Sequence, residues 1–163
     1  ALIPVLDDDG HVLTQSLAII EYLEETHPQP PLLPQAPLDR AYVRACALTI
    51  ACEIHPLNNL RVLRYLVQQL GASDDQKNAW YRHWVEQGLA ALEARVAAER
   101  RYSRYLLGDA VTLADVALVP QIFNARRFDC RLDHVPVLMA IFDRCMELGS
   151  FADAQPARQP DAE

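Results

Sequence analysis

The spacing of hydrophobic residues divides the chain into a short β-like region and a longer α-like region. Two strand-like runs, 1–6 and 11–14, flank the turn sequence Asp-Asp-Asp-Gly at 7–10. An acidic turn that ends in glycine, between two such runs, is typical of a β-hairpin. Two strands alone are unstable in water, so the hairpin needs another element to pack against.

The segment after the hairpin is predicted to be a helix that packs on it. Leu17, Ile20 and Leu23 recur at helical spacing, and Ser16 precedes them where an N-cap residue is favoured. Five prolines then fall between positions 28 and 37. They prevent a continuing helix and give a stiff, extended connection. We therefore expect a first region at 1–27, a linker at 28–38 and a second domain at 39–163.

The second domain has the pattern of an all-α bundle. Pro56 interrupts the first long apolar pattern, 38–70, and should kink it because proline lacks a backbone N–H. Helix breaks are expected at 71–73, near Gly108, at 129–134 and at Gly149. The helix after the first break is expected to bury a core-packing stripe: Trp80, Trp84, Leu89, Leu92 and Val96.

Two further helices are indicated by their starts. Thr112 and Asp115 have the spacing of a capping box, in which a hydroxyl and a carboxylate satisfy free backbone donors. Pro136 suits the first turn of the last long helix. Its apolar stripe is Leu138, Ile141, Phe142, Cys145 and Leu148.

Composition and charge restrict the class of protein. There is no run of about 18 apolar residues, so no membrane span is expected. The net charge of −7 disfavours nucleic acids and anionic membranes as partners. We expect a cytoplasmic protein. The cysteines form neither a CxxC pair nor a metal-ligand spacing, so we predict buried free thiols and no metal site. They are Cys46, Cys52, Cys130 and Cys145.

Several features occur together in an order that resembles a glutathione transferase. They are a hairpin containing Ile3-Pro4, a helix opened by Gln15-Ser16, a proline-rich linker and a helical domain with a capping box. The resemblance implies a mainly α fold, in which the C-terminal part of a thioredoxin-like α/β domain, a hairpin plus a helix, is followed by an all-α helical bundle.

Three longer segments narrow the class. Residues 55–60, HPLNNL, residues 118–128, LVPQIFNARRF, and residues 158–161, RQPD, are similar to the zeta class, which contains the maleylacetoacetate and maleylpyruvate isomerases. The first strand, helix, strand and helix of the thioredoxin-like domain have no counterpart here. The Ser/Cys loop that activates the glutathione sulfur belongs to that part, so no catalytic residue is expected in this chain.

The resemblance implies a glutathione site at the start of the chain. Pro4 cannot donate to a β-ladder, so it lies at an edge, at a bulge or after a cis bond. In the family this bond is cis and turns the backbone of Ile3 toward the cysteinyl part of glutathione. Gln15 and Ser16 stand at a helix N-terminus, which either is simply capped or binds a carboxylate. The resemblance implies that they bind the γ-glutamyl group.

A second polar group surrounds the predicted kink. His55 and Asn59 are four residues apart and share a helix face beside Pro56. On the residues alone, two explanations stay open: these side chains satisfy carbonyls freed by the proline, or they bind a ligand. The resemblance implies that His55, Asn59, Leu60 and Arg61 border bound glutathione.

Arg126 and Arg127 end a predicted helix, where a cation interacts favourably with the helix dipole. A guanidinium group also suits bidentate binding of a carboxylate. Arg127 matches the arginine that faces the active site in the family. We therefore assign Arg127 to substrate binding and Arg126 to solvent.

The function implied is glutathione-dependent cis–trans isomerisation of a small unsaturated dicarboxylate, maleylacetoacetate or maleylpyruvate, in aromatic catabolism. A homodimer is also implied. Two alternatives remain on the sequence alone. One is a truncated, non-catalytic transferase-like module for binding or dimerisation. The other is glutathione conjugation or dehalogenation of small halo acids by the same thiolate and arginine.

Overall fold

The computed structural model describes residues 4–160 and 162, which begin with a β-hairpin. Strands β1 (Val5–Asp8) and β2 (His11–Thr14) pair antiparallel. Asp9 and Gly10 both have positive φ angles, 49° and 86°, as a tight hairpin turn requires. The predicted hairpin is confirmed over these residues. Ile3, with the geometry expected of its bond to Pro4, lies outside the described residues.

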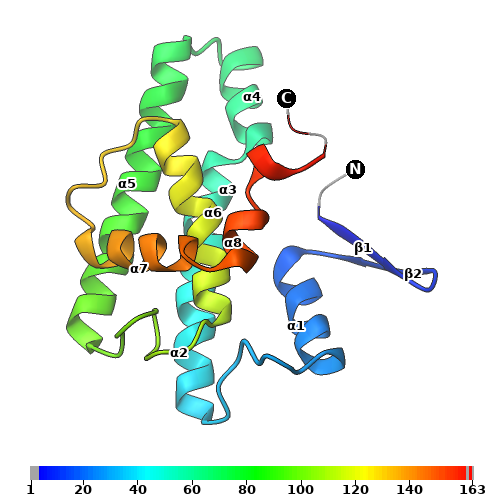
Figure 1. Ribbon diagram of the computed structural model, residues 1–163. Helices are drawn as coiled ribbons and strands as arrows, with labels where there is room; N and C mark the ends of the chain where they lie inside the picture. The colour runs from blue at the N-terminus through cyan, green and yellow to red at the C-terminus, as the bar shows by residue number, and fades with distance from the viewer. Residues whose placement is uncertain (1–3, 161, 163) are drawn as a thin grey trace.

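Helix α1 (Ser16–Thr26) follows the hairpin and packs beside it, to one side of the larger helical body (Figure 1). The hydroxyl of Tyr22 donates to the Asp8 carboxylate and ties the helix to the hairpin. Ser16 is not the N-cap, which corrects the prediction. Gln15 is the N-cap, and its carbonyl accepts from Ile19 N at 3.0 Å. The positive φ of Gln15, 71°, brings Ser16 into the first helical turn.

The proline-rich connection, residues 27–36, is fastened to the rest of the chain. The Glu24 carboxylate accepts from Leu32 N at 2.7 Å and from Leu33 N at 3.0 Å. Leu33 is buried in the core, and Leu32 O accepts from Leu113 N at 2.9 Å. The next helix begins at Pro37, because proline suits the first turn. The predicted domain limits at 28 and 38 stay a prediction.

The long pattern 38–70 forms four successive elements. They are α2 (Pro37–Leu48), the π-helix η1 (Thr49–Ile54), α3 (His55–Asn58) and α4 (Leu60–Gln68). Pro56 stands in the first turn of α3, directly after the wider π turns. The change to extended backbone comes three residues later, at Asn59, whose ψ angle is 141°.

Helix α5 (Asp74–Glu99) starts with a capping box between Ser73 and Gln76 that the sequence analysis did not identify. Trp80 and Trp84 are only partly buried, which corrects the predicted stripe. The fully buried face is rotated by one residue and contains Tyr81, Val85, Leu89, Leu92, Glu93 and Val96. The predicted leucines and valine are confirmed.

Close contact between α5 and η1 depends on Gly88. A Cβ atom at this position would lie 2.5 Å from Cγ1 of Ile54, which is fully buried. Such a distance is too short for two carbon atoms, so the absence of a side chain lets the π-helix approach α5.

Helices α6 (Leu113–Arg127) and α7 (Pro136–Met146) complete the core. The carboxylate of Asp115, which is fully buried, accepts from Thr112 N and Oγ1, both at 2.8 Å, and from Leu106 N at 2.9 Å. The predicted start of α6 is thus confirmed. The predicted stripe of α7 is buried at Leu138, Ile141, Phe142 and Cys145. Two short elements follow, α8 (Gly149–Asp153) and η2 (Pro156–Arg158).

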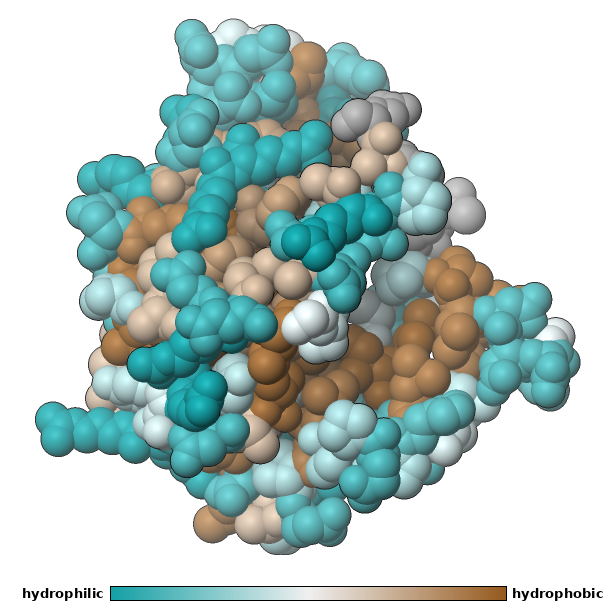
Figure 2. All heavy atoms as spheres, viewed as in Figure 1, coloured by the Kyte–Doolittle hydropathy of each residue, from teal (hydrophilic) through white to brown (hydrophobic). Residues whose placement is uncertain are grey.

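The thiols, the surface and the helices each give one further observation. All four cysteines are free and three are buried, but Cys52 is exposed because it lies on the outer side of η1, which corrects the prediction for this residue. Figure 2 shows apolar residues along the border between the hairpin–α1 region and the helical body. Within the described residues, no helix is both long and apolar enough to cross a membrane.

Candidate functional site

The N-terminus of α1 is the first candidate binding element. Gln15 and Ser16 are both exposed. Since the first intrahelical bond is made by Ile19 N, the N–H groups of the three preceding residues have no acceptor within the helix. Gln15 has a backbone conformation that costs a residue other than glycine about 1–3 kcal/mol. The result is an exposed helix end with free donors and a positive dipole, which suits a carboxylate.

The second candidate element is the corner between α3 and α4. Asn59 Nδ2 lies 3.3 Å from His55 Nε2, and Asn59 Oδ1 accepts from Arg61 N at 3.1 Å and caps α4. Leu60 is 58% exposed between them. The structure therefore brings these four predicted residues together. The alternative, that these side chains satisfy carbonyls freed by Pro56, finds no support. Among the described hydrogen bonds, neither the His55 nor the Asn59 side chain donates to a backbone carbonyl before Pro56.

The electrostatics of this corner favour a neutral imidazole. Packing on one side of the ring lowers the pKa of His55 below its ordinary value, and the positive charge of Arg61 lowers it further. A neutral ring can accept the Asn59 amide hydrogen at Nε2, whereas a protonated ring cannot. Near neutral pH the corner thus offers amide, imidazole and guanidinium groups to a ligand.

Beneath the exposed corner lies a buried pair of amides that the sequence analysis missed. Asn58 Nδ2 donates to Gln121 Oε1 at 3.4 Å, and the two side chains are 5% and 3% exposed. Trp80 Nε1 donates to Leu57 O at 2.8 Å on the other side of the same corner. Asn58 and Gln121 lie inside the two motif segments, but nothing in their spacing indicates that they meet.

The C-terminal end of α6 carries the two adjacent arginines. Arg126 is half exposed, with its guanidinium 4.4 Å from the centre of the Phe142 ring and 3.4 Å from Asp143 Oδ1, so it packs on α7 as well as facing solvent. Arg127 is exposed and, within the described residues, its side chain makes no hydrogen bond or ion pair. Burial raises the pKa of Tyr81 to about 12, while the charge of nearby Arg127 opposes this shift.

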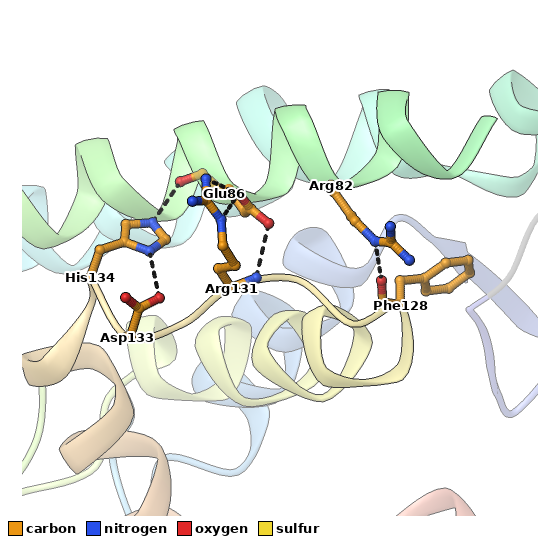
Figure 3. Close-up of polar contacts among 6 residues, drawn as sticks. All are labelled: Arg82, Glu86, Phe128, Arg131, Asp133 and His134. Atoms are coloured by element: carbon orange, nitrogen blue, oxygen red, sulfur yellow. Dashed lines mark hydrogen bonds and ion pairs between the residues drawn. The ribbon is translucent and has the colours of Figure 1, made fainter. Parts of the chain in front are cut away.

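Contacts with α5 fix this end of α6. The Phe128 ring stacks on Tyr81 with centroids 3.8 Å apart and planes 16° from parallel. Arg82 Nε donates to Phe128 O at 2.9 Å, as Figure 3 shows. Further along the loop, Glu86 accepts from Arg131 N at 2.9 Å and from Arg131 Nη2 at 3.0 Å. The position from which Arg127 extends is therefore well determined.

An open hollow of about 370 Å³ lies between α5 and the loop that follows α6, where Figure 3 shows four of its lining residues. Its lining contains none of the predicted site residues. Glu86 is already paired with Arg131, and His134 Nε2 lies 3.3 Å from Glu86 O. Among the residues that the structure describes, no group of three or more His, Cys, Asp or Glu side chains could hold a metal ion. The lining residues are His83, Glu86, Gln87, Arg131, Asp133 and His134.

The predicted site residues thus form three groups in this part of the chain: Gln15 with Ser16 at α1, residues 55–61 at the α3–α4 corner, and Arg127 at the end of α6. No described hydrogen bond or ion pair joins these groups directly. The first two offer hydrogen-bond donors and amide groups, and the third offers a cation that none of the described residues pairs. Together they suit a ligand set that contains several carboxylates.

Comparison with known proteins relates both parts of the chain to one family. The family described as glutathione S-transferase, N-terminal domain, matches residues 1–31, and its C-terminal domain matches residues 78–145. A probable maleylacetoacetate isomerase of Vibrio cholerae is 49% identical over 161 residues, 99% of this chain and 74% of that protein. The similarity therefore extends over both parts of the fold.

Two solved structures are also close. One is a holo maleylpyruvate isomerase described as a bacterial glutathione transferase of the zeta class, with a TM-score of 0.96 and 46% identity over 99% of this chain and 76% of that one. The other is the maleylacetoacetate isomerase of Anaeromyxobacter dehalogenans with bound dicarboxyethyl glutathione and citrate, with a TM-score of 0.92 and 43% identity over 100% of this chain and 75% of that one. The chain therefore belongs to the zeta-class glutathione transferases, within the maleylacetoacetate and maleylpyruvate isomerase family.

Proposed function

We propose that the protein is a glutathione-dependent isomerase that converts the cis double bond of maleylacetoacetate or maleylpyruvate to trans. One observation carries the proposal. An anion-suited helix end, and an arginine without an ion-pair partner among the described residues, occur in a chain that matches isomerases of these substrates over 99% of its length. The products differ from the substrates only in geometry, so the reaction needs positioned ligands and charge stabilisation but no net oxidant or reductant.

The residues present fit glutathione as the cofactor. The free N–H groups at the start of α1 suit its γ-glutamyl carboxylate, with the Gln15 amide and Ser16 hydroxyl beside it. The polar groups of His55, Asn59 and Arg61 suit its amide and second carboxylate. When bound, glutathione supplies the thiol that adds to the substrate double bond and later leaves it. The same two elements hold glutathione so that its thiol end is presented to the substrate.

Arg127 is proposed to bind a substrate carboxylate. Its guanidinium is exposed, has no described ion-pair partner, and can grip two carboxylate oxygens at once. The chain as a whole has a charge of −7, which repels a dianion, so a local cation is needed to bring one in. The same positive charge stabilises negative charge that develops on the substrate during reaction.

We further propose that the protein acts in the cytoplasm, in the catabolism of aromatic compounds, and as a homodimer. The family relationship supports all three proposals. Exposed apolar side chains on the hairpin and α2 would favour association with a second copy. Val12, Leu38 and Leu48 are 65%, 80% and 44% exposed.

The proposed function can be tested with the protein at its native length. Maleylpyruvate, maleylacetoacetate and a small α-halo acid are each supplied with and without glutathione, and product is followed by absorbance and chromatography. We expect the trans isomer to form only when glutathione is present and without glutathione being consumed. A clear preference for the halo acid, with a glutathione conjugate or halide as product, would instead favour dehalogenation. No turnover of any of the three would refute an enzymatic role.

A further inference from the structure

Five polar side chains are buried in the described part of the chain, and two of them differ from the rest. Glu93, Thr112 and Asp115 bond to groups at or before helix N-termini, so helix capping explains their burial. Asn58 and Gln121 bond to each other, between helices and across 63 positions of sequence. Helix capping does not explain this pair.

Stability does not explain the pair either. The Nε2 group of Gln121 is buried and, among the described residues, has no hydrogen-bond partner. A buried donor without a partner is unfavourable, and an apolar pair of the same shape is often at least as stable. What an amide pair provides, and an apolar pair does not, is a directional contact that fixes how two elements lie against each other.

The two elements joined by this pair carry different candidate binding groups. Asn58 is the last residue of α3, between His55 and the Asn59 cap of α4. Gln121 lies on α6, whose last residue is Arg127. Because a helix rises about 1.5 Å per residue, the two side chains on α6 start about 9 Å apart along a rigid element.

We infer that the Asn58–Gln121 pair is a positioning link that sets α6, with Arg127, at a fixed place relative to the α3–α4 corner. This inference rests on the proposed function, in which the corner borders glutathione and Arg127 holds the substrate carboxylate. Trp80 supports the link by holding Leu57 O from α5 at 2.8 Å. Asn58 and Gln121 are both buried, so in this inference they act through the groups they hold and not as ligand-binding residues.

The test compares near-isosteric variants that remove the link with a double variant in which the two amide residues are exchanged. Asn58→Leu and Gln121→Met each break the amide contact at little cost in volume. We expect each to lower kcat for maleylpyruvate about tenfold, because misplacement of bound reactants slows the reaction, while the Kd for glutathione changes less than about threefold. The double variant should be no worse than the poorer single one, since the link is already lost. The exchanged pair, Asn58→Gln with Gln121→Asn, should restore most of kcat.

Glu93→Gln provides a matched control for stability. It weakens a buried contact that holds Val137 N at 2.9 Å and Leu138 N at 3.0 Å, away from the proposed ligands. We expect it to lower Tm but leave kcat within about twofold of the original. If kcat falls as much in this control as in the link variants at a similar loss of Tm, the effect is one of stability and the link is refuted.

A binding measurement separates failure of the link from failure of the proposed function. Malonate, a dicarboxylate with no double bond, is titrated calorimetrically into the glutathione-loaded protein. We expect its Kd to rise about tenfold in each single variant. Unchanged kcat and unchanged malonate affinity in both variants would refute the link alone. If the unaltered protein turns over neither maleyl substrate, the proposed reaction is wrong, and the malonate titration then decides the link. If it binds neither glutathione nor malonate, both are wrong.

Discussion

Arg82 on α5 donates from Nε to the carbonyl oxygen of Phe128, 2.9 Å away, at the first residue after α6. The Phe128 ring meanwhile stacks on Tyr81, the neighbour of Arg82. Two adjacent residues of α5 therefore hold the backbone and the side chain of the same residue. Since Phe128 directly follows Arg127, this double contact limits where the Arg127 side chain can begin.

Removing the Arg82 contact should lower the catalytic efficiency toward the substrate more than the affinity for glutathione. We expect Arg82→Ala to lower kcat/KM for maleylpyruvate several-fold, because the end of α6 gains freedom, while the Kd for glutathione stays within about twofold. Steady-state kinetics and calorimetry measure the two quantities. Lys77→Ala is the control, since it removes an α5 ion pair with the exposed Asp74. An equal effect of both variants would contradict a specific role for Arg82.

Replacement of Arg127 should cause the largest loss of activity among the arginines of α6. Hydrogen bonds to a charged group contribute about 1.5–3 kcal/mol, so Arg127→Ala should lower kcat/KM between about tenfold and a hundredfold. Arg127→Lys should be intermediate, because the charge remains but the bidentate geometry is lost. Arg126→Ala is the adjacent control and should change kcat/KM less than about threefold. Kinetics in which Arg126→Ala is the more damaging would overturn the assignment.

The lowered pKa of His55 predicts a pH-dependent stability. As pH falls below the ordinary histidine value of about 6.5, the unfolded chain takes up a proton before the folded chain does. Stability should therefore decrease through this range and level off below the folded pKa. Urea unfolding at pH 7.5 and 5.5 measures the change, and His55→Gln should reduce it. An identical change in the variant would show that other groups are responsible.

Gly88 provides a test of how closely α5 and η1 must approach. We expect Gly88→Ala to destabilise the protein by about 1–3 kcal/mol, because the new methyl group collides with Ile54 in a packed core. Adding Ile54→Val should recover part of this loss. Valine lacks Cδ1, one of the two Ile54 atoms that the new methyl group meets, and the shorter side chain can shift away from it. Gly149→Ala is a control in open surroundings, where the nearest other atom would be 3.8 Å away. Urea unfolding curves compare the three variants.

The sequence allowed accurate prediction of features that depend on neighbouring residues. The capping box of Thr112 with Asp115, the start of α7 at Pro136 and the hairpin turn at Gly10 all follow from local spacing. The close packing of the π-helix on α5 was not predictable in this way, because it brings together Ile54 and Gly88, which lie far apart in the sequence. The one-residue rotation of the α5 stripe was missed for the same reason, since only packing distinguishes Trp80 from Tyr81.

The candidate site was predicted unevenly for related reasons. His55 and Asn59 were expected to meet because their spacing would place them on one helix face. Their side chains do meet, with Asn59 Nδ2 3.3 Å from His55 Nε2, but Asn59 has extended backbone between α3 and α4, so the predicted shared helix face is wrong. The unusual backbone of Gln15 was not expected, because nothing local marks it. The Asn58–Gln121 pair was also missed, since a contact across 63 positions has no periodic signature. The binding roles of all the predicted site residues came from family resemblance and stay predictions.

The way the proline-rich connection is built into the core has a consequence for how the molecule loses its structure. Leu33 fills a core position, Glu24 binds the backbone on the α1 side, and Leu32 O binds Leu113 at the start of α6. A connection anchored in this way cannot serve as a free hinge. The hairpin with α1 and the helical body should therefore melt in one cooperative transition, and a ligand that binds only at α1 should delay melting and proteolysis of the whole chain.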